Sequence, residues 1–472
     1  MIRAIARIIG LSGLTAAALL LTGGSAQALP AFASQTGQPC VACHIGAFGP
    51  QLTALGRAFK IGGYTQSGGE GLLSQIPLSG MVLTSFSHTA ASVPSDQITT
   101  HYAANNNFSL DQVSAFIGGG WGEHTGGLVQ ITYTNLPNDF NTTQSIHLDN
   151  TDLRPYVTTF SVGDRDLQVG ISVNNGPTVQ DPYNTTFAWG YPFVVSGLAP
   201  TPAAQPVLAG GFAANSIGGT VYAWYDRSLY LEAGIYNTVS GYMLARMGNS
   251  FGPGSSSGVA PYLRAAYEWN WNQQSAHVGA IYFQSNVSPS IAPRETDSSN
   301  GHDSYTDYAI DGGYQFLGTG KHIVTVEGIY THEEQHLQGT VGAFNVANGT
   351  ALSNDYNLEQ FRADASYWFD NTYGVTVAWQ KTWGRANPAL FAPGELGGSA
   401  NGKPNSNAFI FEADWVPFGK GDSWLAPLAN LKLGAQYVAY TEFNGGNNGY
   451  DGVTSRSASD NNTLYLFAWL AF

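Results

Sequence analysis

The residues of this chain with the clearest chemistry are the five from Cys40 to His44, because they contain both of its cysteines. They read Cys-Val-Ala-Cys-His, the CxxCH spacing at which haem is attached covalently. Two thiols three positions apart can add to the two vinyl groups of one haem, and the adjacent imidazole can ligate the iron. The segment therefore predicts one haem c, bound by Cys40 and Cys43 with His44 as proximal iron ligand, and an electron-carrying role.

Two other uses of cysteines at this spacing remain open. The pair could be a thioredoxin-like dithiol or half of a zinc site. A zinc site needs further Cys or His nearby, and a thioredoxin-like dithiol needs a βαβ context. The residues that follow offer neither, so the spacing favours haem.

A second axial ligand would have to come from elsewhere in the chain. Three methionines follow the N-terminal segment, at positions 81, 243 and 247, and Met81 is the nearest to the haem motif. Met81 is our first candidate for the distal ligand, and His88 is the second. Methionine and histidine together would raise the potential relative to two imidazoles. The alternative for Met81 is an ordinary apolar residue of the protein core or surface.

The N-terminus has the features of a secretory signal peptide. Arg3 and Arg7 precede an apolar run from Ile8 to Leu21, and Ala26-Gln27-Ala28 offers a cleavage site. An uncleaved membrane anchor is the alternative, but the run is shorter than the roughly 20 residues that a spanning helix needs. We expect residues 1–28 to be removed on export and the mature protein to lie in the outer membrane of a Gram-negative bacterium.

The composition favours a membrane protein built from strands. Only 11% of residues are charged, 13% are aromatic and 58 are glycine, while the mean hydropathy is −0.10. A transmembrane barrel alternates lipid-facing with lumen-facing residues, so its hydropathy stays near neutral. The net charge of −14 argues against a nucleic-acid partner and is compatible with attracting cations.

Residues 29–75 are expected to form a small helical haem-bearing unit. Pro50 can begin a helix in which Leu52, Leu55 and Phe59 recur at helical spacing, and Gly62 with Gly63 can end it. A unit of this size buries little hydrophobic core. Its stability should therefore depend on haem and on contacts with the rest of the chain. The stretch 66–71 is the expected linker.

Residues 76–472 predict a β-barrel. Segments of roughly 10 residues with alternating hydropathy are separated by turn residues, and an even number of strands is typical of bacterial barrels. The predicted fold is all-β: roughly sixteen antiparallel transmembrane strands, with the α-helical cytochrome unit at or inside the barrel. The sixteen segments begin near Gly80, Phe108, Gly126, His147, Leu167, Ile217, Leu229, Pro261, Ser275, Ser304, His322, Asn357, Thr372, Asn407, Leu431 and Thr463.

The alternation also predicts which side chains line the lumen. Around Leu263 the apolar residues fall on one face, and Arg264 and Glu268 fall on the other. The same pattern places a set of polar and charged residues inside, where most are expected to be solvated or paired: Arg362, Asp364, Glu412, Asp414, Lys432, Gln436, Glu232, Asp307, Asp311 and Glu327.

The last ten residues resemble the closing strand of an outer-membrane barrel. They are rich in aromatic and leucine residues and end on Phe472. A closing strand of a soluble sandwich is the alternative. Tyr465, Phe467 and Trp469 share one face, and if that face points inward they should pack on the haem-bearing unit.

Two segments resemble a known family. Residues 30–64, PAFASQTGQPCVACHIGAFGPQLTALGRAFKIGGY, and residues 173–193, VNNGPTVQDPYNTTFAWGYPF, are similar to the fused monohaem cytochrome-porins of the outer membrane, best known from iron-oxidising bacteria. The resemblance implies a single haem at a barrel of about sixteen strands, electrons taken from an extracellular donor such as Fe(II), and delivery to a periplasmic c-type cytochrome or other carrier. It implies an electron-transfer protein, with Fe(II):cytochrome oxidoreductase as a candidate activity.

One residue departs from the family pattern and leaves the donor open. Many members carry an Arg between an Ala and a Gln ahead of the haem motif, and Ser34 stands in that place here. Three alternatives to electron uptake remain: outward reduction with the same parts, a diffusion porin with a haem-binding plug or sensor, and a haem enzyme such as a peroxidase.

Overall fold

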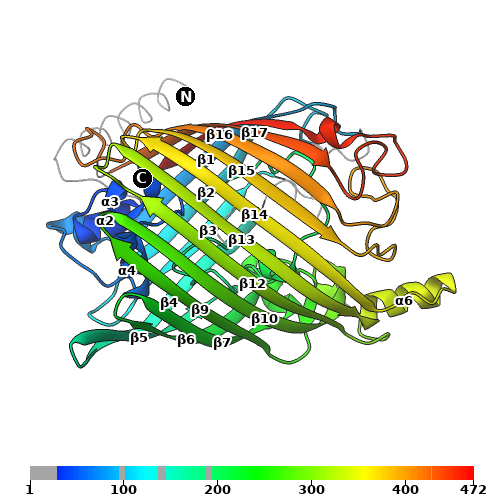
Figure 1. The fold of residues 1–472 in the computed structure, drawn as a ribbon, viewed down its shortest axis with the longest axis horizontal. Coiled ribbons are helices and arrows are strands. Elements are labelled where there is room, and N and C mark those ends of the chain that lie inside the picture. The colour runs from blue at the N-terminus through cyan, green and yellow to red at the C-terminus, as the bar shows by residue number, and fades with distance from the viewer. Residues whose placement is uncertain (1–28, 95–100, 137–144, 187–193, 427) are drawn as a thin grey trace, which may run out of the picture.

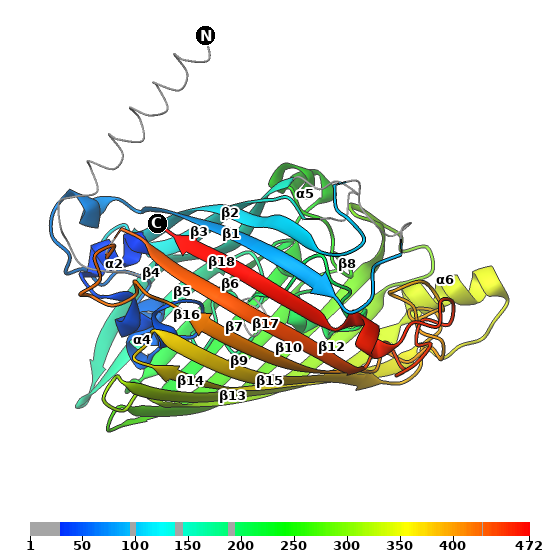
Figure 2. The ribbon, with the colours of Figure 1, turned by 90° about the horizontal axis from the view of Figure 1, so that it is seen from above.

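The strands of this chain close into a single barrel with a small helical unit at one end (Figures 1 and 2). The computed structural model describes residues 29–94, 101–136, 145–186, 194–426 and 428–472. The expected signal peptide at residues 1–28 lies outside the described residues. Among the described residues no helix is both long enough and apolar enough to span a membrane.

Within the described residues sixteen long strands form the wall, as predicted, and two short strands, β8 and β11, add to it at one end. Every pairing is antiparallel, and β1 pairs with both β2 and β18, which closes the barrel. Each strand begins within a few residues of its predicted start. The long strands are β1 (Leu78–Thr89), β2 (Asn107–Gly120), β3 (Gly126–Thr134), β4 (Ser145–Val162), β5 (Arg165–Asn174), β6 (Ser216–Tyr225), β7 (Leu229–Thr238), β9 (Ala260–Trp271), β10 (Gln274–Ala292), β12 (Asp303–Phe316), β13 (His322–Leu337), β14 (Asp355–Phe369), β15 (Tyr373–Gly384), β16 (Ser406–Trp415), β17 (Asn430–Glu442) and β18 (Thr463–Ala471), and the short ones are β8 (Gly254–Ser256) and β11 (Glu295–Thr296).

The inner and outer faces of the wall follow the predicted alternation. On β9 the side chain of Leu263 is 50% exposed, and that of its neighbour Arg264 is 2% exposed. Several of the inward charges are paired: Lys432 contacts Glu412 at 3.0 Å and Asp414 at 2.9 Å. This pairing agrees with the interpretation that most lumen charges stabilise one another rather than carry chemistry.

The helical elements gather at two ends of the barrel. Figure 1 shows α2, α3 and α4 beside the C-terminus, where the short turns lie, and α6 at the opposite end with the long connections. The elements are α2 (Pro30–Thr36), α3 (Cys40–Cys43), η1 (Ile45–Ala47), α4 (Ala54–Ile61), η2 (Leu72–Gln75), η5 (Val207–Ala209), α5 (Gly241–Met247), α6 (Gln338–Asn348) and η6 (Ala458–Asn461).

The predicted helix start at Pro50 is wrong. Helix α4 begins at Ala54, capped by the Thr53 side chain, which accepts a hydrogen bond from the Gly56 N–H at 3.2 Å. Residues 51–53 are extended because their backbone pairs with the haem motif: the Thr53 N–H donates to the Cys43 carbonyl at 2.9 Å. The predicted end at Gly62 is correct.

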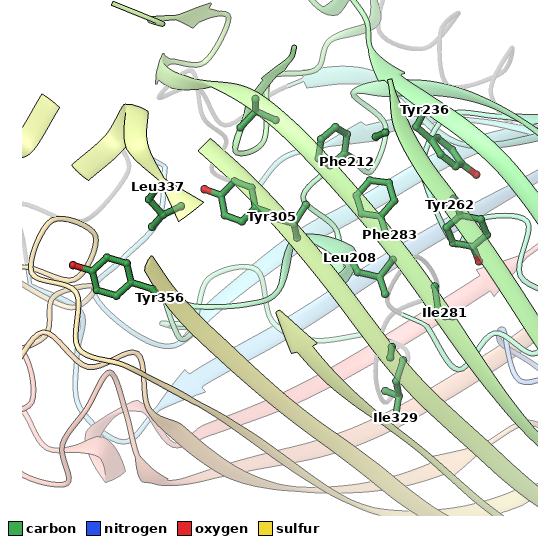
Figure 3. Close-up of a cluster of buried hydrophobic side chains, with 14 of the residues drawn as sticks. Leu208, Phe212, Tyr236, Tyr262, Ile281, Phe283, Tyr305, Ile329, Leu337 and Tyr356 are labelled. Carbon is green, nitrogen blue, oxygen red and sulfur yellow. The ribbon is translucent and has the colours of Figure 1, made fainter. Parts of the chain in front are cut away.

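A long connection between β5 and β6 folds into the lumen; its described residues, 175–186 and 194–215, are called the inner loop below. The Val207 N–H donates to Glu333 at 2.5 Å and the Leu208 N–H donates to Asp307 at 2.9 Å. Figure 3 shows Leu208 and Phe212 of this loop packed among inward-facing aromatic and aliphatic side chains of the wall. One of the predicted lumen carboxylates, Asp307, therefore serves together with Glu333, its partner on the neighbouring strand, to hold a loop across the barrel.

Candidate functional site

A cavity of about 480 Å³ lies between the helical unit and the barrel wall, and it is lined by Cys40, Cys43 and His44. Its volume is within the range of roughly 300–1,000 Å³ that cofactor and ligand pockets occupy. Met81 of β1 lines the same cavity. The structure thus brings together four of the five residues that the sequence singled out for haem, and His88 is the exception.

Both cysteines belong to one short helical turn. Helix α3 follows the extended residue Pro39, and the His44 N–H donates to the Cys40 carbonyl at 2.9 Å. Cys40 is 1% exposed and Cys43 is partly exposed, and neither is in a disulfide. Burial raises the pKa of the Cys43 thiol to about 11. Catalytic dithiols have lowered pKa values, so this environment argues against the thioredoxin-like alternative.

The His44 imidazole is held in its neutral form. Burial lowers its pKa to about 4, although the nearby backbone of Gly49 raises it in part. Its Nδ1 atom makes no hydrogen bond of ordinary geometry within the described structure. A neutral imidazole is the form of histidine that ligates metals.

Met81 is directed into the cavity by the alternation of β1 and by an aromatic neighbour. It pairs with Ala471 of β18, and its side chain is 6% exposed. The Trp469 indole N–H donates to the Met81 sulfur at 3.1 Å. A thioether sulfur has two lone pairs, so this hydrogen bond leaves one for another partner.

His88, the second candidate for distal ligand, is excluded by its position. It lies on the outer face of β1, where its ring is hydrogen-bonded to Asn106 at 2.8 Å. It is seven positions from Met81 along β1, so strand alternation places the two side chains on opposite faces.

The aromatic face of the last strand points inward, as its pattern allowed. Tyr465 and Phe467 are buried. The Trp469 ring packs edge to face on Phe48 of the helical unit, with 5.0 Å between the ring centroids. The expected packing of this face on the helical unit is therefore confirmed for Trp469.

The walls of the cavity are mostly apolar, with a polar part. Aromatic and aliphatic side chains from α2, α4 and the wall strands line it, and polar side chains from β3, β4, α4 and the inner loop add hydrogen-bonding groups. The apolar set includes Phe32, Phe48, Leu52, Phe59, Phe116, Leu128 and Trp469, and the polar set includes Gln130, Asp149, Asn150, Asn184 and Lys60.

Residues 56–60 fasten the site to the barrel. A Cβ at Gly56 would overlap the carbonyl oxygen of Cys43, so the helix can approach the haem motif only with glycine there. Arg57 donates from Nε and Nη2 to both carboxylate oxygens of Glu268 on β9, at 3.1 and 2.6 Å. It also donates from Nη1 to the Leu52 carbonyl at 2.7 Å. This bidentate pair is buried and specific in geometry.

Lys60 connects the same helix to the inner loop. Its Nζ donates to the carbonyls of Val179 and Asp181 at 2.8 and 2.7 Å and to the Asn184 side chain at 2.9 Å. Burial lowers its pKa to about 7, and the charges of Asp152 and Asp181 oppose that shift. The Asn184 side chain in turn donates to the Pro50 carbonyl at 2.6 Å.

A further contact closes the helical unit against β4. The Tyr64 hydroxyl donates to Asp152 at 2.8 Å, and Arg154 donates to the same carboxylate oxygen at 3.0 Å. Burial and the neighbouring Asp152 raise the pKa of Tyr64 well above its usual value, so the phenol keeps its proton.

The matches of this chain to known proteins are matches to solved structures. No family model and no curated protein matches the chain. Solved structures that match include the channel DcaP of Acinetobacter baumannii (11% identity, TM-score 0.44, 84% of this chain and 96% of that chain), in-vitro folded OmpT of Vibrio cholerae (9%, 0.42, 84% and 96%) and an anion-selective porin from Comamonas acidovorans (11%, 0.41, 84% and 98%).

Sequence reasoning did not assign the roles of residues 56–60. The segment Gly-Arg-Ala-Phe-Lys lies within residues 30–64, which carry the family resemblance. Two basic residues, Arg57 and Lys60, on a short helix with an apolar face are a usable signal of buried contacts. When both ends of such a helix are packed, its charged side chains need buried partners. Their partners on β9 and the inner loop lie too far along the chain to be identified from sequence.

Proposed function

We propose that this chain is an outer-membrane electron-transfer protein with one haem c bound through Cys40 and Cys43 and ligated by His44. It transfers electrons between an extracellular donor, for which Fe(II) is a candidate, and a periplasmic carrier. The observation that carries the proposal is the cavity that both cysteines, His44 and Met81 line together.

The residues present fit a haem group. The two thiols and the imidazole lie on one turn at the cavity wall, and His44 Nδ1 is buried without a partner of ordinary hydrogen-bond geometry. Haem iron supplies one-electron redox chemistry when the group is bound. Phe59, Phe116 and Leu128 line the cavity with apolar surface that excludes water. Low solvent access and a thioether ligand both favour a higher potential, which suits a weak reductant as donor.

The outer surface of the barrel supports a membrane location. Large apolar side chains are exposed on outward faces all around the wall, among them Val113, Phe160, Val221, Ile310, Val377 and Leu466. A closed barrel satisfies all of its backbone hydrogen bonds within the wall, which the hydrocarbon interior requires. Helix α2, near the start of the described residues, and the C-terminal Phe472 lie at the short-turn end, which faces the periplasm in such barrels.

Two segments that lie inside the barrel favour electron transfer over diffusion of solutes. The inner loop is hydrogen-bonded to β12, β13 and β17, and the helical unit is fastened to β4 and β9. A porin needs a continuous aqueous path, and these two segments lie across it.

Vesicles test this directly. We expect Fe(II) added outside sealed vesicles that contain the holoprotein to reduce the haem, seen in its absorption bands at acidic or neutral pH, while sugars cause no swelling. Protein-free vesicles and vesicles with a general porin are the controls. Swelling with sugars would establish the diffusion porin instead, and unreduced haem would remove Fe(II) as donor.

Met81 is the distal ligand in this proposal. Met81→Ala should abolish the near-infrared absorption band of sulfur–iron ligation in the oxidised protein, because within the described residues no other methionine lines the cavity. Leu83→Ala is the matched control, since Leu83 is also inward-facing and buried on β1. A band that survives in Met81→Ala would show that another group ligates the iron.

A further inference from the structure

A second cavity, of about 330 Å³, lies between residues 195–205 of the inner loop and the wall strands β14 to β17. It shares no lining residue with the first cavity. Several of its lining residues, such as Thr382, Ser406 and Thr463, lie at the strand ends that carry the long connections. Met81 and Ala471, which line the first cavity, lie at the opposite ends of their strands.

The lining of this second cavity has a distinct chemistry. Among the described residues that line it, the polar groups are amides and hydroxyls, Arg362 is the one charged side chain, and none carries a carboxylate. The whole chain carries 32 acidic residues, and many point into the same lumen. A cavity that avoids them while keeping a guanidinium favours a ligand with a negative charge.

Two buried amides leave acceptors open. Gln360 and Gln436 are 2% and 1% exposed. Their NH₂ groups are used: Gln360 donates to Thr382 at 3.1 Å, and Gln436 donates to the Val194 carbonyl at 2.8 Å. The Oε1 atom of each has no partner in the described structure. Buried polar atoms are nearly always hydrogen-bonded, so these oxygens call for a donor.

The open acceptor on Gln360 and the guanidinium of Arg362 belong to neighbouring positions of the wall. Gln360 and Arg362 lie two positions apart on the same face of β14, and across the ladder they oppose Thr382 and Gln380 of β15. A ligand that meets both groups presents an acceptor oxygen to the Arg362 guanidinium and a donor, such as a hydroxyl, to Gln360.

We propose that the second cavity binds a small hydroxycarboxylate, with its carboxylate on Arg362 and its hydroxyl donating to Gln360. This site does not depend on haem, so it stands or falls separately from the electron-transfer proposal.

Calorimetry on the full chain in detergent tests the site with two probes, L-malate and succinate. They carry the same two carboxylates, and only malate has the hydroxyl. Malate should bind roughly 10-fold more tightly, the effect of one buried hydrogen bond to an otherwise open acceptor. Gln360→Leu should bring the two dissociation constants to about equality.

The role of the charge is tested by Arg362→Gln, which should weaken the binding of both acids at least 10-fold. Arg362→Lys should retain part of the affinity. Arg385→Gln is the matched control: Arg385 is exposed just beyond β15 and donates to the Asp355 carbonyl, so binding should not change. The proposal is overturned if malate does not bind, if glucose binds as well as malate, or if a correctly folded Arg362→Gln protein binds like the wild type.

Discussion

Serine at both Cys40 and Cys43 is expected to abolish covalent haem attachment completely. The chain has no other cysteine, so no thioether bond can form, and any haem that enters the cavity is then held by His44 and apolar contacts alone. The measurement is haem staining of the protein after denaturing electrophoresis, supported by the intact mass. The wild type should stain and carry the mass of one haem, and the double variant should do neither.

Single variants and a surface control sharpen this result. Cys43→Ser should still form one thioether through Cys40 and stain more weakly than the wild type. Ser74→Ala, which removes an exposed hydroxyl of the same helical unit, should stain fully. If the wild-type protein carries no covalent haem after expression with the machinery that attaches haem c, the haem proposal is refuted. The dithiol interpretation is then favoured.

Arg57→Ala should lower the free energy needed to undock the helical unit from the barrel by about 3–5 kcal/mol. The reason is that the substitution leaves Glu268 buried without its partner. Trypsin cleavage after Lys60 measures this opening, because the Lys60 side chain is 4% exposed and is reached only when the unit undocks. Cleavage should become roughly 100-fold faster or more, as an opening equilibrium shifted by 3 kcal/mol or more requires.

Two further variants separate the ion pair from general damage. Arg165 and Asp226 form an ion pair whose side chains are 57% and 41% exposed, so Arg165→Ala should change the cleavage rate little. Arg57→Met combined with Glu268→Leu removes both charges and should recover much of the protection. If Arg57→Ala is cleaved no faster than Arg165→Ala, the pair does not hold the unit in place.

Strand pattern and haem motif were readable from local sequence alone. The side-chain period of two, cut by turn residues, predicted all sixteen long strands of the wall and the inward direction of residues such as Arg264 and Lys432. That signal is local, because alternation in one strand is set by its two faces and not by its partners. The helix start was missed for the opposite reason: residues after Pro50 pair with Cys43 and Ile45, and a backbone pairing of this kind leaves no mark in composition.

The sequence by itself determined that this protein is a barrel of alternating strands with a CxxCH unit in front of it. Only the tertiary structure decided which distant groups surround that motif. Met81 and Trp469 reach it because the first and last strands pair to close the barrel, and Arg57 meets Glu268 because the unit lies against β9. Such contacts depend on closure and docking, which join residues hundreds of positions apart, and no local pattern encodes which residues those are.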